Sequence, residues 1–242
     1  MKSLSIIGFG TFGQFIAPYL RSYYNVYVWN RTDYKGKADQ LGVQWSSIEN
    51  CLTKDIIILC TNIAYFEDFL KKHGSQINSK AIVLDVASIK MKPMELMYKY
   101  LPSTCEIIGT HPLFGPQSGK NGIEGLSMVV CGKNTVNEKC LVDFLSKELK
   151  LKVTLMTPEE HDRQMAYAQG LTHFVGRAIH QMQIPESEPF TKAYKHLLDI
   201  KTMLGGDSWD LFLSIQNENP YAKEIRKAFI DQLNDLEQNL KQ

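Results

Sequence analysis

The sequence lacks a long apolar run and carries almost no net charge. No segment approaches the ~20 consecutive apolar residues of a membrane-spanning helix, and Met1-Lys2 lead directly into a strand-like segment rather than into a signal peptide. Lys and Arg number 27 against 26 Asp and Glu, a formal net charge of +1, so no broad basic field favours nucleic acid as a partner. These absences predict a cytoplasmic protein that binds neither membranes nor nucleic acid.

Cysteine is scarce and poorly placed for cross-links. The chain has 5 cysteines, an odd number, and none of them form a C-x-x-C pair. The pattern therefore indicates neither a disulfide framework nor a thiolate zinc site, and we predict no metal site. Buried free thiols in a reducing compartment are expected instead.

What the sequence does contain is an alternation of short apolar runs and amphipathic stretches up to residue 156. The runs predicted as strands are Ser3–Ile7, Val26–Trp29, Ile56–Leu59, Ala81–Val86, Glu106–Gly109, Met128–Cys131 and Val153–Met156. Helical patterns occupy Phe12–Tyr23, Tyr65–His73, Met91–Tyr100 and Val136–Leu149. Most of the runs are rich in Ile, Val and Leu, as in strands covered on both faces. Alternation of this kind favours a parallel sheet with right-handed crossovers.

After Thr157-Pro158 the pattern becomes helical. Thr157 is a candidate N-cap and Pro158 a candidate first-turn residue. Breaks in the helical period are expected near Pro185, Gly205-Gly206 and Pro220. The sequence thus predicts an α/β fold class, with a Rossmann-like, doubly wound sheet over residues 1–156 and an all-α domain over residues 157–242. Because the helical segment is short of core by itself, we expect a homodimer formed through it.

A glycine loop follows the first predicted strand and opens a helix. It reads Gly8-Phe9-Gly10-Thr11-Phe12-Gly13, a G-x-G-x-x-G pattern. By spacing, Gly8 makes the tight turn, Gly10 admits a pyrophosphate close to the backbone, and Gly13 lets the helix pack on the sheet. The helix N-terminus would face the phosphates. The loop predicts dinucleotide binding by Gly8, Gly10, Thr11, Phe12 and Gly13, with a purely structural glycine turn as the alternative.

The end of the second predicted strand selects the cofactor. It reads Asn30-Arg31-Thr32-Asp33, with Asn30 at the position where NAD-binding chains place an acidic residue on the ribose. A guanidinium and a hydroxyl suit a 2′-phosphate, so Asn30, Arg31 and Thr32 predict NADP. NAD is the alternative, if Arg31 is only a solvated cation and Asp33 turns back to the ribose. Cys60 and Thr61, after the third predicted strand, are further candidate cofactor contacts.

Ser88 and His111 follow the next two predicted strands. Ligands of an open parallel sheet bind beyond the carboxyl ends of its strands, where both residues are expected. Histidine is the usual general base near neutral pH, and a nearby hydroxyl can fix its ring. A histidine in a loop is more often structural, so the residues alone leave both roles open for His111.

Several segments resemble signatures of the prephenate and arogenate dehydrogenases. Residues 111–116 (HPLFGP) resemble their H-P-[ML]-F-G-P run, and residues 85–90 (DVASIK) resemble D-V-x-S-[VI]-K. Residues 160–163 (EHDR) and 169–173 (QGLTH) are similar to their E-H-D-R and Q-x-x-[TR]-H segments. Residues 206–212 (GDSWDLF) are similar to the G-D-S-F-D-L stretch of the plant-type arogenate enzymes.

This resemblance implies a Rossmann domain, a helical dimerisation domain and an active site between them. It implies that hydride leaves ring C4 for the nicotinamide while His111 takes the C4 hydroxyl proton and carbon dioxide is lost. Ser88 would bond to His111 or to the substrate hydroxyl. Lys120, Gln169 and His173 are candidate substrate contacts. The alternative for Lys120 is a solvated lysine, and for Gln169 and His173 a structural bond to the backbone at the domain junction. His161 has either a role in the site or a capping and salt-bridge role in the first helical turn, and the residues leave both open.

One departure leaves the substrate open. Prephenate-specific members carry an arginine in the helical domain, whereas residues 201–206 (KTMLGG) contain none. Lys201 offers a point charge rather than a bidentate fork, and Arg177 is another candidate cation. Arogenate and prephenate therefore both remain candidates. The alternative functions are an NADP-binding redox sensor without catalysis and a β-hydroxyacid-type dehydrogenase, although the G-x-x-G-x-G-x-x-x-K pattern of the latter is missing from the sequence.

Overall fold

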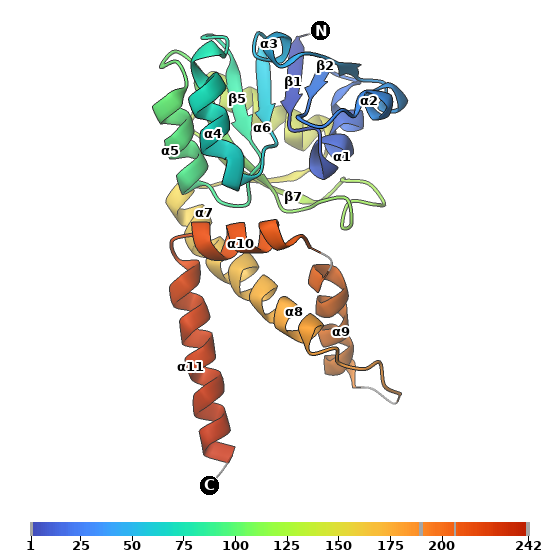
Figure 1. Cartoon of the computed structure of the whole chain (residues 1–242), viewed down its shortest axis with the longest axis vertical. Helices are drawn as coiled ribbons and strands as arrows, with labels where there is room; N and C mark the ends of the chain where they lie inside the picture. The colour runs from blue at the N-terminus through green and yellow to red at the C-terminus, as the bar shows by residue number, and fades with distance from the viewer. Residues whose placement is uncertain (1, 189–190, 206, 241–242) are drawn as a thin grey trace. The chain divides into compact units, whose positions relative to one another are not determined.

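The chain forms two compact units of different structural class. The computed structural model describes residues 2–188, 191–205 and 207–240. Unit 1 spans Met1–Glu159 and unit 2 spans Glu160–Gln242. Unit 1 is a Rossmann-like α/β sheet with helices on both faces, and the described residues of unit 2 form helices joined by loops, without a strand (Figure 1). The predicted fold class is therefore confirmed.

Unit 1 is built on an eight-stranded sheet. Its strands are β1 (Ser3–Ile7), β2 (Asn25–Trp29), β3 (Gln44–Trp45), β4 (Ile56–Leu59), β5 (Ile82–Asp85), β6 (Glu106–Pro112), β7 (Ser127–Cys131) and β8 (Lys152–Leu155). Their spatial order is β3-β2-β1-β4-β5-β6-β7-β8. Strand order reverses on either side of β1, because β2 lies on one side of it and β4 on the other. This is the switch point where doubly wound sheets bind ligands.

The prediction of a parallel sheet is wrong at one edge. Strands β1 to β6 are parallel, but β7 pairs antiparallel with β6, and β8 runs parallel to β7. The segment between β6 and β7, residues 113–126, contains no helix. A parallel return requires a long crossover that is usually helical, whereas a loop permits the antiparallel return seen here. The missing helical period between residues 113 and 126 was the available signal.

Helices cover both faces of the sheet. They are α1 (Thr11–Leu20), α2 (Lys35–Leu41), α3 (Ile48–Cys51), α4 (Ile63–His73), α5 (Met91–Tyr100) and α6 (Val136–Asp143), with a 3-10 turn at Gly74–Gln76 and π-helical turns at Phe144–Glu148. Side chains of α1, α2 and α6 share one core cluster, and those of α3, α4 and α5 share the other. Adjacent Ile6 and Ile7 of β1 are both fully buried, one in each cluster. Apolar residues on both faces explain the continuous apolar strands.

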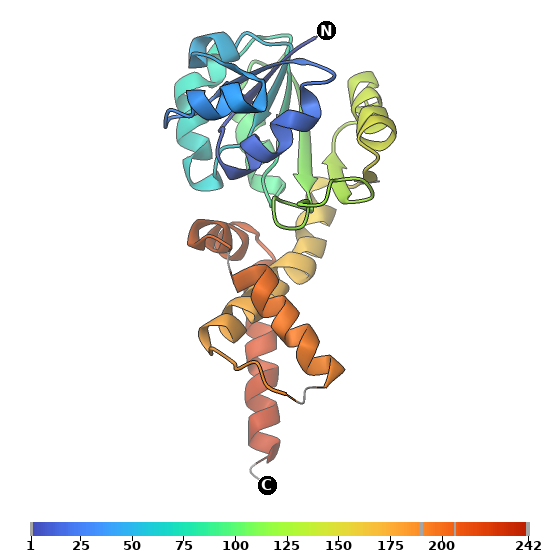
Figure 2. The ribbon, with the colours of Figure 1, turned by 90° about the vertical axis from the view of Figure 1, so that its right-hand side faces the viewer.

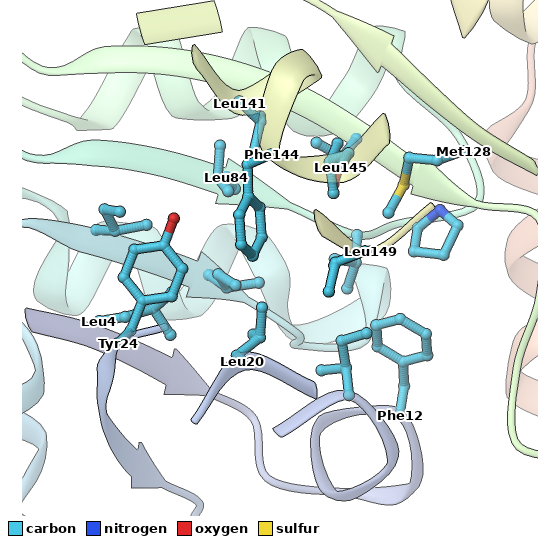
Figure 3. Close-up of a pocket in the computed structure, with 16 residues that line it drawn as sticks. Leu4, Phe12, Leu20, Tyr24, Leu84, Met128, Leu141, Phe144, Leu145 and Leu149 are labelled. Atoms are coloured by element: carbon cyan, nitrogen blue, oxygen red, sulfur yellow. The ribbon is translucent and has the colours of Figure 1, made fainter. Parts of the chain in front are cut away.

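Packing between α1 and the α6 segment leaves a cavity of about 60 Å³ (Figure 3). Phe12 and Leu20 line it from α1, Leu145 from the π-helical turns, and Thr110 and Pro112 from β6. Successive side chains of a strand point to opposite faces. Since Thr110 and Pro112 face the cavity, His111 between them points to the opposite face, which α4 and α5 cover.

The described residues after Thr157 form five helices. They are α7 (Pro158–Met165), α8 (Thr172–Gln181), α9 (Lys192–Gly205), α10 (Trp209–Glu218) and α11 (Ala222–Leu240). Pro158 begins α7, as predicted, and π-helical turns at Ala166–Leu171 join α7 to α8. Pro185 and Pro220 lie between helices, whereas Gly206 falls outside the described residues. None of the described helices is both long and apolar enough to cross a membrane.

Candidate active site

The glycine loop has the geometry that its pattern predicts. Gly8 has φ +103°, and a Cβ there would lie 2.6 Å from the carbonyl oxygen of Cys60 at the end of β4. A Cβ on Gly13 would lie 2.5 Å from the carbonyl oxygen of Gly8. Both positions therefore exclude a side chain. At Gly8 the positive φ and the end of β4 exclude it, and at Gly13 the close packing of α1 on the loop excludes it.

The amino end of α1 fits a diphosphate. Gly10 is its N-cap, and among the described residues no side chain caps it. No described atom lies within 4 Å of where a Cβ on Gly10 would stand. The first-turn amides, including those of Thr11 and Phe12, point toward this open space with the positive end of the helix dipole. Gly8, Gly10 and Gly13 thus form a cradle that suits the pyrophosphate of a dinucleotide.

The end of β2 presents a cation over an aromatic ring. The guanidinium of Arg31 lies 5.4 Å from the centre of the Tyr65 ring, in the first turns of α4. Asn30 donates its amide to the carbonyl oxygen of Thr32 at 3.2 Å. The Asp33 carboxylate accepts the backbone N–H of Lys35 at 2.7 Å. Asp33 therefore faces the start of α2, and Tyr65 is a neighbour of Arg31 that the sequence pattern did not single out.

Cys60 and Thr61 follow β4 at the switch point. The backbone N–H of Cys60 bonds to the carbonyl oxygen of Ile7 at 2.8 Å, which ties the end of β4 to β1 beside the glycine loop. Burial raises the pKa of the Cys60 thiol, and the Asp85 carboxylate acts in the same direction. The Cys60 thiol is therefore protonated, so Cys60 is not a nucleophile.

His111 lies inside a strand rather than in the loop that we expected. The predicted strand ends at Gly109, but β6 continues to Pro112. Its last residues keep strand geometry because β7 pairs with them, with Val129 opposite His111. The side chain of His111 is buried, with 3% of the residue exposed. An antiparallel neighbour far along the chain, which no local pattern reveals, thus orients this histidine.

The structure brings the segments of Ser88 and His111 to the same edge of the sheet. Asp85, the last residue of β5, pairs with Gly109 of β6. Ser88 lies three residues beyond Asp85 and His111 two residues beyond Gly109, so both lie toward the carboxyl ends of these parallel neighbouring strands. Thr110 donates its hydroxyl to the carbonyl oxygen of Asp85, which holds the two strand ends together. Ser88 itself is half-buried.

Lys120 is exposed on the loop between β6 and β7. The loop packs on α1 through Phe114, whose ring centre lies 6.3 Å from that of Phe15. A Cβ on Gly119 would lie 2.5 Å from the Phe15 ring, so the residue before Lys120 is also held closely. The position of Lys120 is fixed, whereas its side chain extends from the surface.

Unit 2 contains a polar cluster around His173. The ring Nδ1 of His173 lies 3.3 Å from an oxygen of the Asp207 carboxylate. Arg177 donates from Nη2 to the backbone oxygen of Asp207 at 2.6 Å and lies over the Trp209 ring, 5.5 Å from its centre. The Nε of Arg177 and the Oε1 of Gln169 are buried without a hydrogen-bond partner among the described residues. Buried polar atoms of this kind are rare unless water or a ligand binds them.

Electrostatics keep His173 neutral near pH 7. Burial lowers the pKa of His173, the Asp207 carboxylate raises it, and the Arg177 guanidinium lowers it again.

Gln169 lies in the π-helical turns Ala166–Leu171, a type of helix irregularity that is frequent at functional sites. Lys201 instead donates to the carbonyl oxygen of Ile184 at 2.8 Å. Arg177 is therefore the cation beside His173.

His161 belongs to a different, internal arrangement. Its Nδ1 lies 2.7 Å from the Asp162 carboxylate, and both side chains are fully buried. Asn219 donates to the backbone oxygen of Asp162 at 2.8 Å and so ties α7 to the end of α10. These contacts hold the start of α7 against the end of α10.

Comparison with known proteins matches both units. Residues 16–147 match the family model described as prephenate dehydrogenase, nucleotide-binding domain. Residues 178–242 match the model described as TYRAAT1-like, C-terminal domain. Arogenate dehydrogenase 2, chloroplastic, of Arabidopsis thaliana is 32% identical over 91% of this chain and 65% of its own length. A probable arogenate/prephenate dehydrogenase of Methanocaldococcus jannaschii is 32% identical over 99% of this chain and 57% of its own length. The chain thus spans less than two thirds of the length of either relative.

Solved structures share the fold. Prephenate dehydrogenase from Aquifex aeolicus, in complex with hydroxyphenyl propionate and NAD+, superposes with a TM-score of 0.78 at 22% identity, over 99% of this chain and 91% of that chain. Arogenate dehydrogenase from Synechocystis gives a TM-score of 0.70 at 20% identity, over 99% of this chain and 93% of that chain. At these identities the superpositions establish the fold alone.

Proposed function

Because the chain belongs to the prephenate dehydrogenase family, we propose that it oxidises and decarboxylates arogenate or prephenate in tyrosine biosynthesis. The observation that carries the proposal is the position of His111, held by β6 and β7 at the ligand-binding edge of a sheet whose glycine loop fits a dinucleotide. A redox sensor would keep the glycine loop but would have no use for a histidine fixed beside the Ser88 turn.

The protein groups act on the substrate alcohol. The oxidised nicotinamide, when bound, supplies the hydride acceptor. His111 removes the proton of the C4 hydroxyl as hydride departs, which avoids a full positive charge on carbon. Ser88 bonds to His111 or to the same hydroxyl and fixes the direction of the proton transfer. Loss of the ring carboxylate as carbon dioxide then makes the ring aromatic and the reaction effectively irreversible.

A direct assay tests the proposal. We expect absorbance at 340 nm to rise when the full chain is mixed with NADP and arogenate or prephenate, because reduced nicotinamide absorbs there. Carbon dioxide should be released in equal amount. If neither substrate reduces either cofactor while NADP still binds, the activity is absent and the redox-sensor alternative replaces it.

We further propose NADP as the preferred cofactor. The guanidinium of Arg31 lies near the end of β2, where the 2′-phosphate binds in NADP-dependent Rossmann folds. The carboxylate of Asp33 is engaged with the backbone N–H of Lys35 and so does not compete for the ribose hydroxyls. Both observations support a phosphate at this position rather than a bare ribose.

Replacing Arg31 with Ala is expected to weaken NADP binding about 10- to 150-fold, because a hydrogen bond to a charged group contributes about 1.5–3 kcal/mol. NAD binding should change little, since NAD has no 2′-phosphate. Fluorescence titration gives both dissociation constants, and Lys37→Ala, which removes an exposed cation from α2, is the matched control. Equal losses for the two cofactors would contradict the assignment.

For the substrate we propose arogenate, on the basis of the cluster in unit 2. Arg177 offers a guanidinium for a carboxylate, and Asp207 offers a carboxylate for an ammonium. Arogenate carries both groups on its side chain, whereas prephenate has no ammonium. Gln169 and His173, with Lys120 from unit 1, are proposed as the remaining substrate contacts. An anionic side chain without the ammonium would meet the Asp207 carboxylate unfavourably.

We also propose a homodimer formed through unit 2. Among the residues of α11 up to Leu240 only Ala222 is buried, and the helix extends away from α10 (Figures 1 and 2). Ile230, Leu233 and Leu240 recur at helical spacing with exposed fractions from 40% for Ile230 to 86% for Leu240. An apolar stripe of this kind is typical of a surface that a second copy covers.

Sedimentation at micromolar concentration is expected to give twice the mass of 27.6 kDa. The double variant Leu233→Glu/Leu240→Glu should shift the protein to monomer, because it places charges in the apolar stripe. Lys223→Glu on the same helix, near its buried start, is the control for added charge. A monomeric mass for the unmodified protein would overturn the dimer.

A further inference from the structure

A fully buried ion pair lies beneath the turn of Ser88 and the strand of His111. The ammonium of Lys90 donates to the Asp85 carboxylate and to the backbone oxygen of Thr110, the latter at 2.7 Å. Both charged side chains have no exposed surface. The reaction proposed above uses neither of them.

Stability alone does not explain this pair. Removing two charges from water costs several kcal/mol for each ion, and buried pairs can often be replaced by apolar residues without loss of stability. Burial raises the pKa of the Asp85 carboxyl, and the Lys90 ammonium only opposes that effect. Retention of such a pair calls for a role that an apolar replacement would not fill.

The surrounding backbone makes room for the lysine. A Cβ on Gly109 would lie 3.2 Å from Cδ of Lys90 and 2.7 Å from the sulfur of Met94 in α5. Glycine inside a strand weakens it, and often marks a close approach of another group. Here the approaching groups are the Met94 sulfur and the aliphatic part of Lys90, which lie against β6 on the face where His111 points.

Each end of the ion pair bonds to the backbone of the residue that precedes Ser88 or His111. Lys90 bonds to the carbonyl oxygen of Thr110, the residue before His111. The Asp85 oxygen that accepts from Lys90 also accepts the backbone N–H of Ala87, the residue before Ser88, at 3.0 Å. A continuous set of hydrogen bonds therefore joins the backbones that carry Ser88 and His111.

We propose that Lys90 and Asp85 are positioning residues that fix where His111 stands relative to Ser88. The inference rests on the proposed function. Misplacement of a reacting group by about 1 Å lowers turnover about 100-fold, even when the change lies outside the reacting atoms. Loss of the pair should therefore lower kcat while leaving the cofactor cradle of Gly8, Gly10 and Gly13 intact.

The experiment compares a single with a double substitution in the full chain. Lys90→Met leaves a lone buried carboxylate, and we expect a lower Tm together with a kcat reduced about 100-fold. Asp85→Asn/Lys90→Met removes both charges at similar volume, so Tm should recover while kcat stays low. NADP affinity should stay within about threefold of the unmodified protein in both. Leu70→Ala, on the buried face of α4, is the control that lowers Tm with kcat retained.

The outcomes separate the two roles. A double variant that regains both Tm and kcat would overturn the proposal, because the pair would then serve folding alone. Low kcat at recovered Tm supports it. Absence of turnover in the unmodified protein would instead refute the proposed function itself.

A second comparison decides if the double variant does not fold. Lys90→Met and Leu70→Ala both lower Tm, but only Lys90→Met breaks the ion pair. Both are assayed at a temperature well below the lower of their two Tm values. A kcat of Lys90→Met about 100-fold below that of Leu70→Ala, with an unchanged dissociation constant for NADP, supports positioning. Equal kcat values overturn it.

Discussion

Replacing His111 with Asn is expected to lower kcat about 10²- to 10⁴-fold, the range that a general base contributes. Asparagine has no basic nitrogen to take the hydroxyl proton, yet it is polar and no larger than histidine. The strand should hold it, because β7 pairs with β6 from Gly109 to Pro112 through the backbone. Affinity for NADP should be retained, since the glycine cradle lies on β1 and α1.

Steady-state rates at 340 nm and a fluorescence titration with NADPH measure the two quantities separately. His196→Asn is the matched control, because His196 is exposed on α9 and its nearest acidic partner, Asp199, is 3.9 Å away. Turnover above about a tenth of normal in the His111 variant would refute its role as base.

Replacing Asp207 with Asn is expected to shift the substrate preference from arogenate toward prephenate. The change removes the charge that we assign to the ammonium while keeping the backbone oxygen that Arg177 binds. A lost charge-assisted hydrogen bond of about 1.5–3 kcal/mol should lower kcat/KM for arogenate about 10- to 150-fold. Prephenate, without an ammonium, should lose nothing and gain from the removed repulsion. His173 stays neutral, because burial and Arg177 both lower its pKa.

The readout is the ratio of kcat/KM for the two substrates. Asp210→Asn, in the first turn of α10, is the control for loss of one acidic charge beside the cluster. An unaltered ratio in the Asp207 variant would show that this carboxylate does not select the substrate.

Local pattern was enough to predict most of the sheet and the cofactor loop. The glycine spacing, the apolar strands and helix α5 at Met91–Tyr100 all follow from neighbouring residues, so they are visible in the sequence. Strand β3 and helices α2 and α3 were missed because two to seven residues carry too little period. The direction of β7 was missed because it depends on the connection rather than on the strand itself.

The contacts of the candidate site were harder to predict because they join distant parts of the chain. Arg177 and Asp207 are 30 residues apart, and Lys90 and Thr110 are 20 apart. The family motifs pointed to several of these residues individually, but no spacing rule pairs them. The burial of His111 likewise depends on β7, so a loop was the natural but wrong expectation.

The two faces of β6 differ in how well they accept larger side chains. On the cavity side, Thr110 and Pro112 border about 60 Å³ of empty space, so a bulkier neighbour there can be absorbed without displacing the strand. On the α5 side, Gly109 admits not even a methyl group, because Lys90 and Met94 already fill that volume. Divergent copies of this chain should therefore accept larger apolar side chains around the cavity but keep glycine at position 109.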